Sequence, residues 1–424
     1  MNINEVKAFN KEYKINTELE KKFKFVAPED RIVISSVAGK PKKLGIEILK
    51  RFFTKPVVLI ALAVFIIILL LSILVPANGI SYYKPNDPIS DNAFVKNLPP
   101  ASSPIVTQAL ESNDPVFKFY QFVLNRSETD PVYKARMAFF LNGFQAKVND
   151  VGIYVAKYNA YDLVVANYIN GIISKNQITD AEYLKIFNEQ KNFYSHVLLG
   201  TSSIGYDIWT TAWYATWRAI KIALIVVILE AIIGISIGAF LGFYAGKLID
   251  TIIMRVIEIF LAPPTLIWIL LFVSIIGANE WSLVLTLTIV GWPGFVGITR
   301  MFIITVKDEE FIIAAKAIGV GTPRRIFVHA LPTIIGKIAN NIVRSVPGVI
   351  LWIASLAFLG FFKEKKDTNL GQMLIEASQE VGSNIWIIAL PTIILLFLSL
   401  SLNFIALGVH DALDPRVMNK GKGK

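Results

Sequence analysis

Side chains that could carry out bond chemistry are scarce in this sequence of 424 residues. There is no cysteine, which excludes thiolate metal sites and disulfide bonds. The three histidines, His196, His329 and His410, lie too far apart in the sequence for a ligand cluster of the usual kind. A phosphate-binding loop of the Gly-Lys-Ser/Thr type is also missing. We therefore expect no catalytic residues, no metal site and no cofactor bound by this chain.

One carboxylate, Glu230, lies near the middle of a long apolar run, between VVIL and AIIG. A charged group at the centre of a membrane is costly and usually faces protein or water rather than lipid. We expect Glu230 to line a translocation path, where it would attract a positively charged group of a substrate. The alternative is a structural role, in which Glu230 pairs with a polar group on another helix.

The segment DEEFIIAAKAIGVGTPRRIFVHALP, residues 308–332, separates two other apolar runs. Asp308 is the expected N-cap of a short helix, and the two glutamates that follow it suit the positive end of the helix dipole. An apolar face with small residues then recurs at helical spacing, at Phe311, Ala314, Ala315 and Ile318. Such a face would let another protein surface approach closely.

Two glycines, Gly319 and Gly321, are expected to end this short helix, because glycine tolerates the left-handed conformation of a helix end. Thr322 and the proline after it would begin a second helix, with Arg324 exposed in its first turn. The sequence thus predicts a helix, a tight turn and another helix.

The elements that must position these residues are membrane helices. Hydrophobic residues make up 54% of the chain, and the mean hydropathy is +0.54. Six apolar runs are long enough to cross a bilayer, and in lipid such runs must be helical. Each run is expected to be one span: 56–76, 217–245, 251–277, 281–306, 334–361 and 385–408.

Orientation follows from the basic residues that flank the spans. Residues 1–55 hold 13 Lys and Arg against 7 Asp and Glu, whereas residues 77–212 hold 11 against 12. We therefore expect a plasma-membrane protein with both termini and the 306–333 loop in the cytosol and 77–212 outside. Membrane orientation accounts for the net charge of +10, so no nucleic-acid partner is needed.

The polar segments have their own expected structures. An apolar repeat at Leu44, Ile48 and Phe52 predicts a helix on the inner leaflet within the cytosolic segment 1–55. Within 77–212, helix-start signals at Asp130 and at Thr179, with many aromatic residues, predict a mostly helical lobe at about 102–195. A disordered loop is the alternative for this lobe. A five-helix core, 213–408, and a cytosolic tail, 409–424, complete an all-α integral membrane protein.

Five stretches resemble one family. AAKAIG, nine further residues and then HALP resemble the cytoplasmic coupling motif of ABC importer permeases. The other four are similar to segments of the C-type permease subunit of the dipeptide, oligopeptide and nickel importers: HVLLGTSSIGYD at 196–207, IDTIIMRVIEI at 249–259, SLAFLGF with NLGQML at 355–361 and 369–374, and DALDPR at 411–416.

This sequence departs from the family pattern at three places. Ile313 stands where the motif has a glutamate, and Glu309, four residues earlier on the same face, is a candidate replacement. The GTSSIGYD segment has serines and a tyrosine where the family usually has acidic residues and arginine. About 95 residues separate LPP, at 98–100, from this segment, where the family usually has a few.

The resemblance implies a permease subunit that forms half of an importer's pathway and carries out no catalysis. Its implied partners are a homologous second permease, two ATP-binding subunits that hold ATP and Mg²⁺, an extracellular substrate-binding protein, a peptide substrate and the bilayer. The residues expected to couple the pathway to an ATPase subunit are Glu309, Phe311, Ala314, Ala315, Ile318, Gly319, Gly321 and Arg324.

The 102–195 lobe is expected to help to receive the binding protein. The alternative is that the lobe is a folded domain that makes no direct contact with that protein. For the whole chain, two other functions remain open. One is a permease for nickel or another small solute, and the other is a multi-span surface receptor or adhesin that presents the lobe.

Overall fold

The computed structural model describes Lys11 and residues 44–77, 80–148, 154–175, 177–277, 279–361, 369–379 and 384–413. The chain divides into two compact units, 1–50 and 51–424. A helix at the expected interfacial position, α4 (Leu44–Phe52), crosses the boundary between them. Most of the tail at 409–424 and the end of the DALDPR stretch lie outside the described residues.

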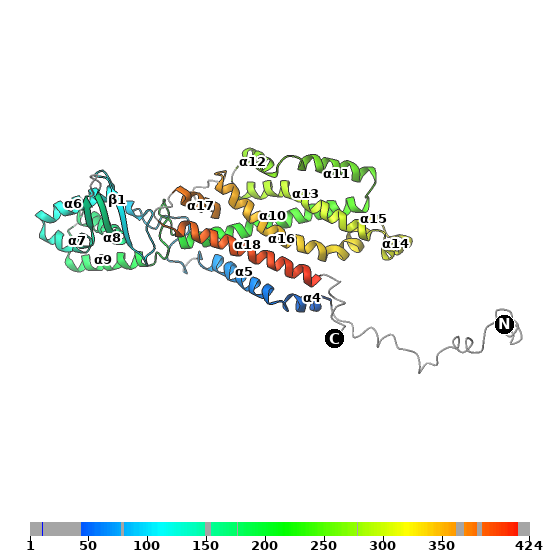
Figure 1. Ribbon diagram of the computed structural model, residues 1–424, viewed down its shortest axis with the longest axis horizontal. Coiled ribbons are helices and arrows are strands. Elements are labelled where there is room, and N and C mark those ends of the chain that lie inside the picture. Colours follow the sequence, from blue (N-terminus) through cyan, green and yellow to red (C-terminus); the bar gives the residue numbers. More distant parts are fainter. Residues whose placement is uncertain are drawn as a thin grey trace, which may run out of the picture. The chain divides into compact units, whose positions relative to one another are not determined.

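Among the described residues, five helices are long and apolar enough to cross a membrane, and a bent pair of shorter helices could make a sixth span (Figure 1). Those that match expected spans directly are α5 (Pro56–Leu74), α13 (Glu280–Val306) and α18 (Trp386–Leu413). Two others begin earlier than expected: α10 (Ile208–Phe243) and the helical stretch that leads into α16 (Leu331–Phe358). A short helix, α17 (Leu370–Gln379), packs between α16 and α18.

The expected span 251–277 is not one straight helix. It forms α11 (Leu248–Leu261) and α12 (Thr265–Ile276), which are bent by 83° relative to each other. Two consecutive prolines, Pro263 and Pro264, lie at the break, and proline both lacks a backbone N–H and clashes with the preceding helical turn. The bend is braced by Trp268, whose indole Nε1 donates to the Phe260 carbonyl over 2.7 Å. The sequence prediction missed this break because it weighed hydropathy alone.

The two helices α10 and α13 pack closely against each other, because glycines line the contact face of α10. Gly234, Gly238 and Gly242 recur every four residues along α10, so they share one face. A Cβ at Gly238 would lie 2.6 Å from the Val296 carbonyl of α13, and one at Gly242 would lie 2.7 Å from the Ile303 Cβ. Small residues at this spacing let membrane helices approach until their backbones touch.

The lobe contains a sheet that the sequence analysis did not predict. Three antiparallel strands lie in the order β1-β3-β2, with β1 (Ile105–Leu110), β2 (Gln145–Val148) and β3 (Tyr154–Asn159). Four helices accompany the sheet: α6 (Pro115–Thr129), α7 (Pro131–Gly143), α8 (Ala160–Ile173) and α9 (Asp180–Ser195). The lobe is mostly helical, as expected, but the all-α description is wrong for these three strands. The strands are short, and the longer helical patterns beside them gave the stronger signal.

Both helix starts predicted in the lobe are confirmed. The Asp130 side chain accepts from the backbone N–H groups of Val132 and Tyr133 at the start of α7. Thr179 and Glu182 form a reciprocal capping box at the start of α9. The lobe has its own core, which includes the fully buried side chains of Tyr133, Met137 and Phe140.

The LPP and GT segments meet where the lobe joins the membrane helices. The Thr201 N–H donates to the Leu98 carbonyl over 3.1 Å, and the Leu98 N–H donates to the Thr201 hydroxyl over 2.9 Å. Asn384, just before α18, donates to the carbonyls of Leu98 and Leu199. Gly200 has φ +88°, and a Cβ there would overlap the Leu98 carbonyl. The junction therefore requires glycine at this position.

Candidate functional site

The predicted helix-turn-helix is present between α13 and α16. Its first helix is α14 (Glu310–Ala317), and its N-cap is Glu309 rather than the expected Asp308. The Gly319 N–H donates to the Lys316 carbonyl and the Val320 N–H to the Ala315 carbonyl, which together form a Schellman motif. Gly319 has φ +84°, as this motif requires.

Gly321 does not have the conformation that was expected of it. Its φ of −62° and ψ of 151° are extended backbone that any residue adopts. Of the two glycines, only Gly319 reverses the chain, and Gly321 is the N-cap of α15 (Thr322–Arg324). The two glycines differ in a way that sequence alone does not reveal, because it does not give the sign of φ.

The apolar residues of α14 divide between two faces. Ile312 and Ala315 are buried, and Ile312 packs in a cluster with residues of α10, α13 and α16. Phe311, Ile313 and Ile318 are exposed by 44%, 56% and 81%, and we call these three residues the α14 patch. Glu309 and Ala314 are exposed beside it. Ala315 therefore packs against the chain itself and does not belong to the exposed face on which the sequence analysis placed it.

The second helix of the motif continues into a membrane span. After α15, a π-helical turn, η2 (Arg325–Ala330), leads directly into α16. The Leu331 N–H donates a hydrogen bond to the carbonyl of Ile326, which lies five residues earlier, as in a π-helix. The Arg325 guanidinium lies 5.3 Å from the ring centroid of Phe243, at the end of α10, whereas Arg324 is exposed. A displacement of this turn would therefore reach both α16 and α10.

Glu230 lies on α10 and is buried, with 6% of its surface exposed. Gly291 of α13 faces it so closely that a Cβ at this position would overlap the Glu230 carboxylate. The carboxylate borders a cavity of about 250 Å³, whose lining also includes Thr265, Ser345 and Trp352. Among the described residues, none donates a hydrogen bond to Glu230.

An ion pair between α11 and α13 was not predicted from the sequence; its carboxylate is buried and its guanidinium is partly exposed. Arg300 of α13 donates to both carboxylate oxygens of Asp250 of α11, over 2.7 Å each, and the Gly246 N–H also donates to this carboxylate. The Asp250 side chain is 3% exposed. Asp250 lies within the IDTIIMRVIEI stretch, so an acidic residue at the start of an apolar helix was the available signal.

Comparisons with known proteins agree with this architecture. Residues 234–419 match the family model described as "Binding-protein-dependent transport system inner membrane component", and residues 43–100 match "N-terminal TM domain of oligopeptide transport permease C". The oligopeptide transport system permease protein OppC of Mycoplasma pneumoniae is 32% identical over 389 residues, which cover 90% of this chain and 93% of that protein. OppC of Mycoplasma genitalium is 31% identical, with the same coverage of both chains.

A dipeptide permease matches less of the chain. The DppC protein of Haemophilus influenzae is 33% identical over 172 residues, which cover 41% of this chain and 58% of that protein. The lobe at 102–195 is more than a fifth of the sequence, so an alignment that covers 90% of the chain must include most of it. The chain therefore belongs to the OppC/DppC-type family of binding-protein-dependent transport inner-membrane permeases, and it is a multi-pass membrane transport component rather than an ATPase.

Proposed function

We propose that this chain forms half of the translocation pathway of an ATP-driven importer for oligopeptides. The observation that carries the substrate class is the alignment with two oligopeptide permeases over 90% of the chain. The proposed partners are those of the family: a second permease, two ATP-binding subunits that hold ATP and Mg²⁺, and a substrate-binding protein.

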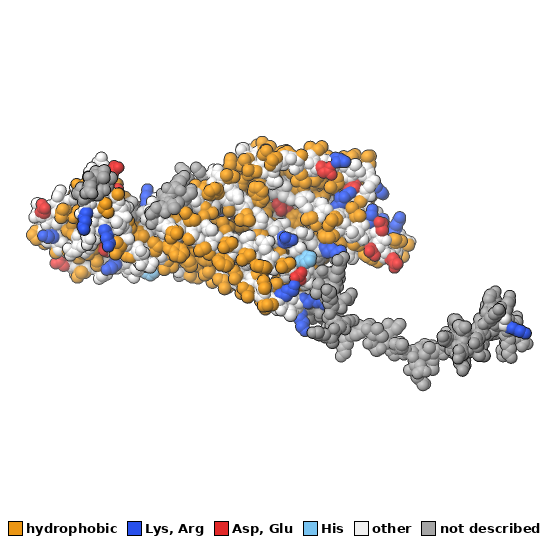
Figure 2. Space-filling model, viewed as in Figure 1, with side chains coloured by type: hydrophobic (Ala, Val, Ile, Leu, Met, Phe, Trp, Pro, Cys, Tyr) orange, Lys and Arg blue, Asp and Glu red, His pale blue; other side chains and the backbone are white. Residues whose placement is uncertain are grey.

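The proposed orientation places the α14 end of the membrane helices in the cytosol and the lobe outside. Basic side chains gather at the α14 end of the membrane helices (Figure 2). In the sequence, residues 300–337 hold six Lys and Arg against three Asp and Glu. Such an excess of lysine and arginine beside the spans favours the cytosolic side.

The α14 patch is the proposed contact with an ATP-binding subunit. Monomeric proteins rarely leave large apolar side chains gathered on a short helix in water, because apolar surface is stabilised by burial. Glu309 and Ala314 lie beside the patch and would border the same contact. Ile313 replaces the motif glutamate, so this contact would be apolar at the position where the family pattern has a charge.

Glu230 is proposed to line the pathway. Its cavity is bordered by α10, α12, α13 and α16, and no described group neutralises the carboxylate. The ammonium group of a peptide would provide the opposite charge.

The aromatic residues of the lobe are divided between its interior and its surface. Tyr133, Phe140 and Tyr158 lie in the lobe's own core, whereas Phe122 and Tyr168 are exposed. Aromatic residues at helical spacing are most often core. Docking remains a proposal for the lobe, and deletion between Ala101 and His196 tests it through capture of the binding protein.

The function is tested by co-purification and transport. The chain should co-purify with the second permease and with two ATP-binding subunits, and vesicles containing the complex and its binding protein should accumulate a labelled oligopeptide when ATP is supplied. Accumulation of nickel without any peptide uptake would refute the proposed substrate class. Failure to recover an ATP-binding subunit would refute the importer.

A further inference from the structure

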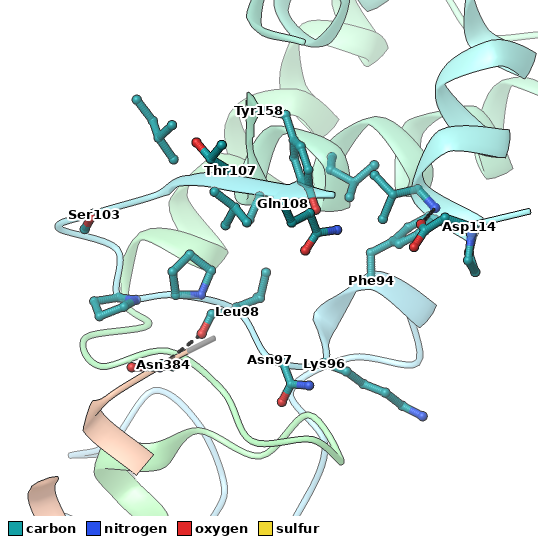
Figure 3. A pocket seen from close by; sticks show the side chains of 18 of the residues that line it. Phe94, Lys96, Asn97, Leu98, Ser103, Thr107, Gln108, Asp114, Tyr158 and Asn384 are labelled. Carbon is teal, nitrogen blue, oxygen red and sulfur yellow. Dashed lines mark hydrogen bonds between the residues drawn. The ribbon is translucent and has the colours of Figure 1, made fainter. Parts of the chain in front are cut away.

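A large cleft lies along one edge of the lobe's sheet (Figure 3). Its volume is about 1020 Å³. One wall is β1, and the opposite wall is the segment 96–100 with the short helix η1 (Ala93–Val95) before it. Asn384 and Trp386 line the cleft at the start of α18, so it extends from the sheet to a membrane span.

The wall formed by β1 is an unpaired strand edge. Because β3 is the central strand, β1 has a partner on one side only. Pro104 lies opposite Ala160, and the Ala160 N–H donates to the Pro104 carbonyl, so this pair is hydrogen-bonded. Hydrogen-bonded pairs alternate along an antiparallel ladder. The backbone groups of Ile105, Thr107 and Ala109 therefore point to the outer edge, where no described residue pairs with them.

The side chains of the cleft offer both apolar and polar contacts. Phe94 and Leu98 provide apolar surface, and Gln108 and Tyr158 point into the space (Figure 3). The Tyr158 hydroxyl is protonated at neutral pH, as in any tyrosine, and burial raises its pKa further, to about 12. Asn97, in the wall opposite β1, has a buried Oδ1 without a hydrogen-bond partner in the described structure. An occupant with alternating donors and acceptors would suit these groups.

We propose that this cleft is a receiving site for the transported oligopeptide, which binds there in extended form as an additional strand on the outer edge of β1. An unpaired strand edge specifies an extended polypeptide, because main-chain hydrogen bonds supply affinity that depends little on sequence. The six residues of β1 span roughly 20 Å, so peptides of about six residues fit its length. Continuity with α18 favours the transported peptide over other extended chains, because it leads from the sheet to the membrane helices. The inference rests on the proposed function.

The first test measures binding of a fluorescein-labelled hexapeptide, Ala-Val-Thr-Ala-Val-Thr, to the complex without its binding protein. Thr107→Pro removes an outer N–H without removing a bond to β3, and proline is tolerated at such an edge. Thr107→Val keeps the N–H and is the matched control. We expect Thr107→Pro to weaken binding about tenfold or more, since it removes a hydrogen bond and adds the bulk of the ring, whereas Thr107→Val stays within about twofold.

The second test requires no change to the protein. A hexapeptide N-methylated at its two central residues lacks a donor in either pairing register, and it should also bind about tenfold more weakly. Equal affinity for methylated and unmethylated peptides would overturn the proposal. So would equal affinity of the Thr107→Pro and Thr107→Val complexes.

Two further outcomes separate this site from other possibilities. If Thr107→Pro weakens capture of the binding protein and leaves peptide affinity unchanged, the edge is a protein-docking surface and the proposal is wrong. If the unmodified complex imports peptides with ATP, and the Thr107 variants bind the hexapeptide equally well, the receiving site is rejected and the importer function stands. Failure of peptide import altogether would instead reject the proposed function.

Discussion

The sharpest prediction compares two glycines in the turn after α14. Gly319 and Gly321 are two residues apart, and a Cβ at either position would meet no atom within 4 Å. They differ in backbone conformation, because φ is +84° at Gly319 and −62° at Gly321. An alanine at each position therefore isolates the cost of the left-handed conformation from any effect of crowding.

The magnitude follows from this difference. A side chain in the left-handed region costs about 1–2 kcal/mol, so Gly319→Ala should destabilise the closed turn by that amount. For Gly321→Ala, the change in the stability of the turn should be near zero. The alanine reduces the conformational freedom of the unfolded chain, and this gain about offsets the poorer N-cap. A change of 1–2 kcal/mol shifts an equilibrium by roughly 5- to 30-fold.

Two measurements check the prediction. Hydrogen exchange should be accelerated in α14 by roughly 5- to 30-fold in Gly319→Ala and hardly at all in Gly321→Ala. In vesicles, Gly319→Ala should lower peptide uptake per ATP hydrolysed, because the α14 patch no longer holds one orientation. Gly319→Val should act in the same direction, whereas Arg324→Ala should have little effect, since an exposed charge contributes little. Identical exchange and transport in the two alanine variants would refute the reasoning.

Three other predictions concern the membrane helices. Gly238→Leu should prevent recovery of folded protein, measured by size-exclusion chromatography in detergent, because its Cβ would lie 2.6 Å from the Val296 carbonyl. Glu230→Gln should lower peptide uptake without loss of complex assembly, and unchanged uptake would remove Glu230 from the pathway. Asp250→Asn should lower the free energy of unfolding by about 2 kcal/mol, because it weakens two charge-assisted hydrogen bonds from Arg300, which is itself partly exposed. Thermal unfolding identical to that of the parent would show that this ion pair contributes nothing.

The sequence predicted features that depend on neighbouring residues. Helix caps at Asp130 and Thr179 depend on side chains that reach backbone groups within three residues, so they were found where they were expected. Five of the six expected spans correspond to long helices among the described residues, because their length and hydropathy are local properties. The turn after α14 was also predicted, although the N-cap was shifted by one residue and Gly321 was given the wrong conformation.

Features that depend on distant contacts were missed. The pairing of β1 with β3 joins residues that are about fifty positions apart, and each strand is too short to show its period clearly. The Asp250–Arg300 ion pair also spans fifty positions. Ala315 lies on a helix face that was correctly predicted to be apolar. Its burial could not be predicted, because it depends on how α14 packs against other helices of the chain.

The helix α16 provides a physical route from the α14 patch to the cavity beside Glu230. Ile312, on the buried face of α14, belongs to one cluster with Ile334 and Ile338 of α16, and α14 packs against η2, which leads into that span. We therefore expect a shift of α14 to move the start of α16. Further along the same helix, Ser345 and Trp352 line the cavity. Packed interiors are close to incompressible and transmit displacement. An ATP-binding subunit that held the patch could therefore change the shape of the cavity through one continuous helix, without direct contact with the peptide.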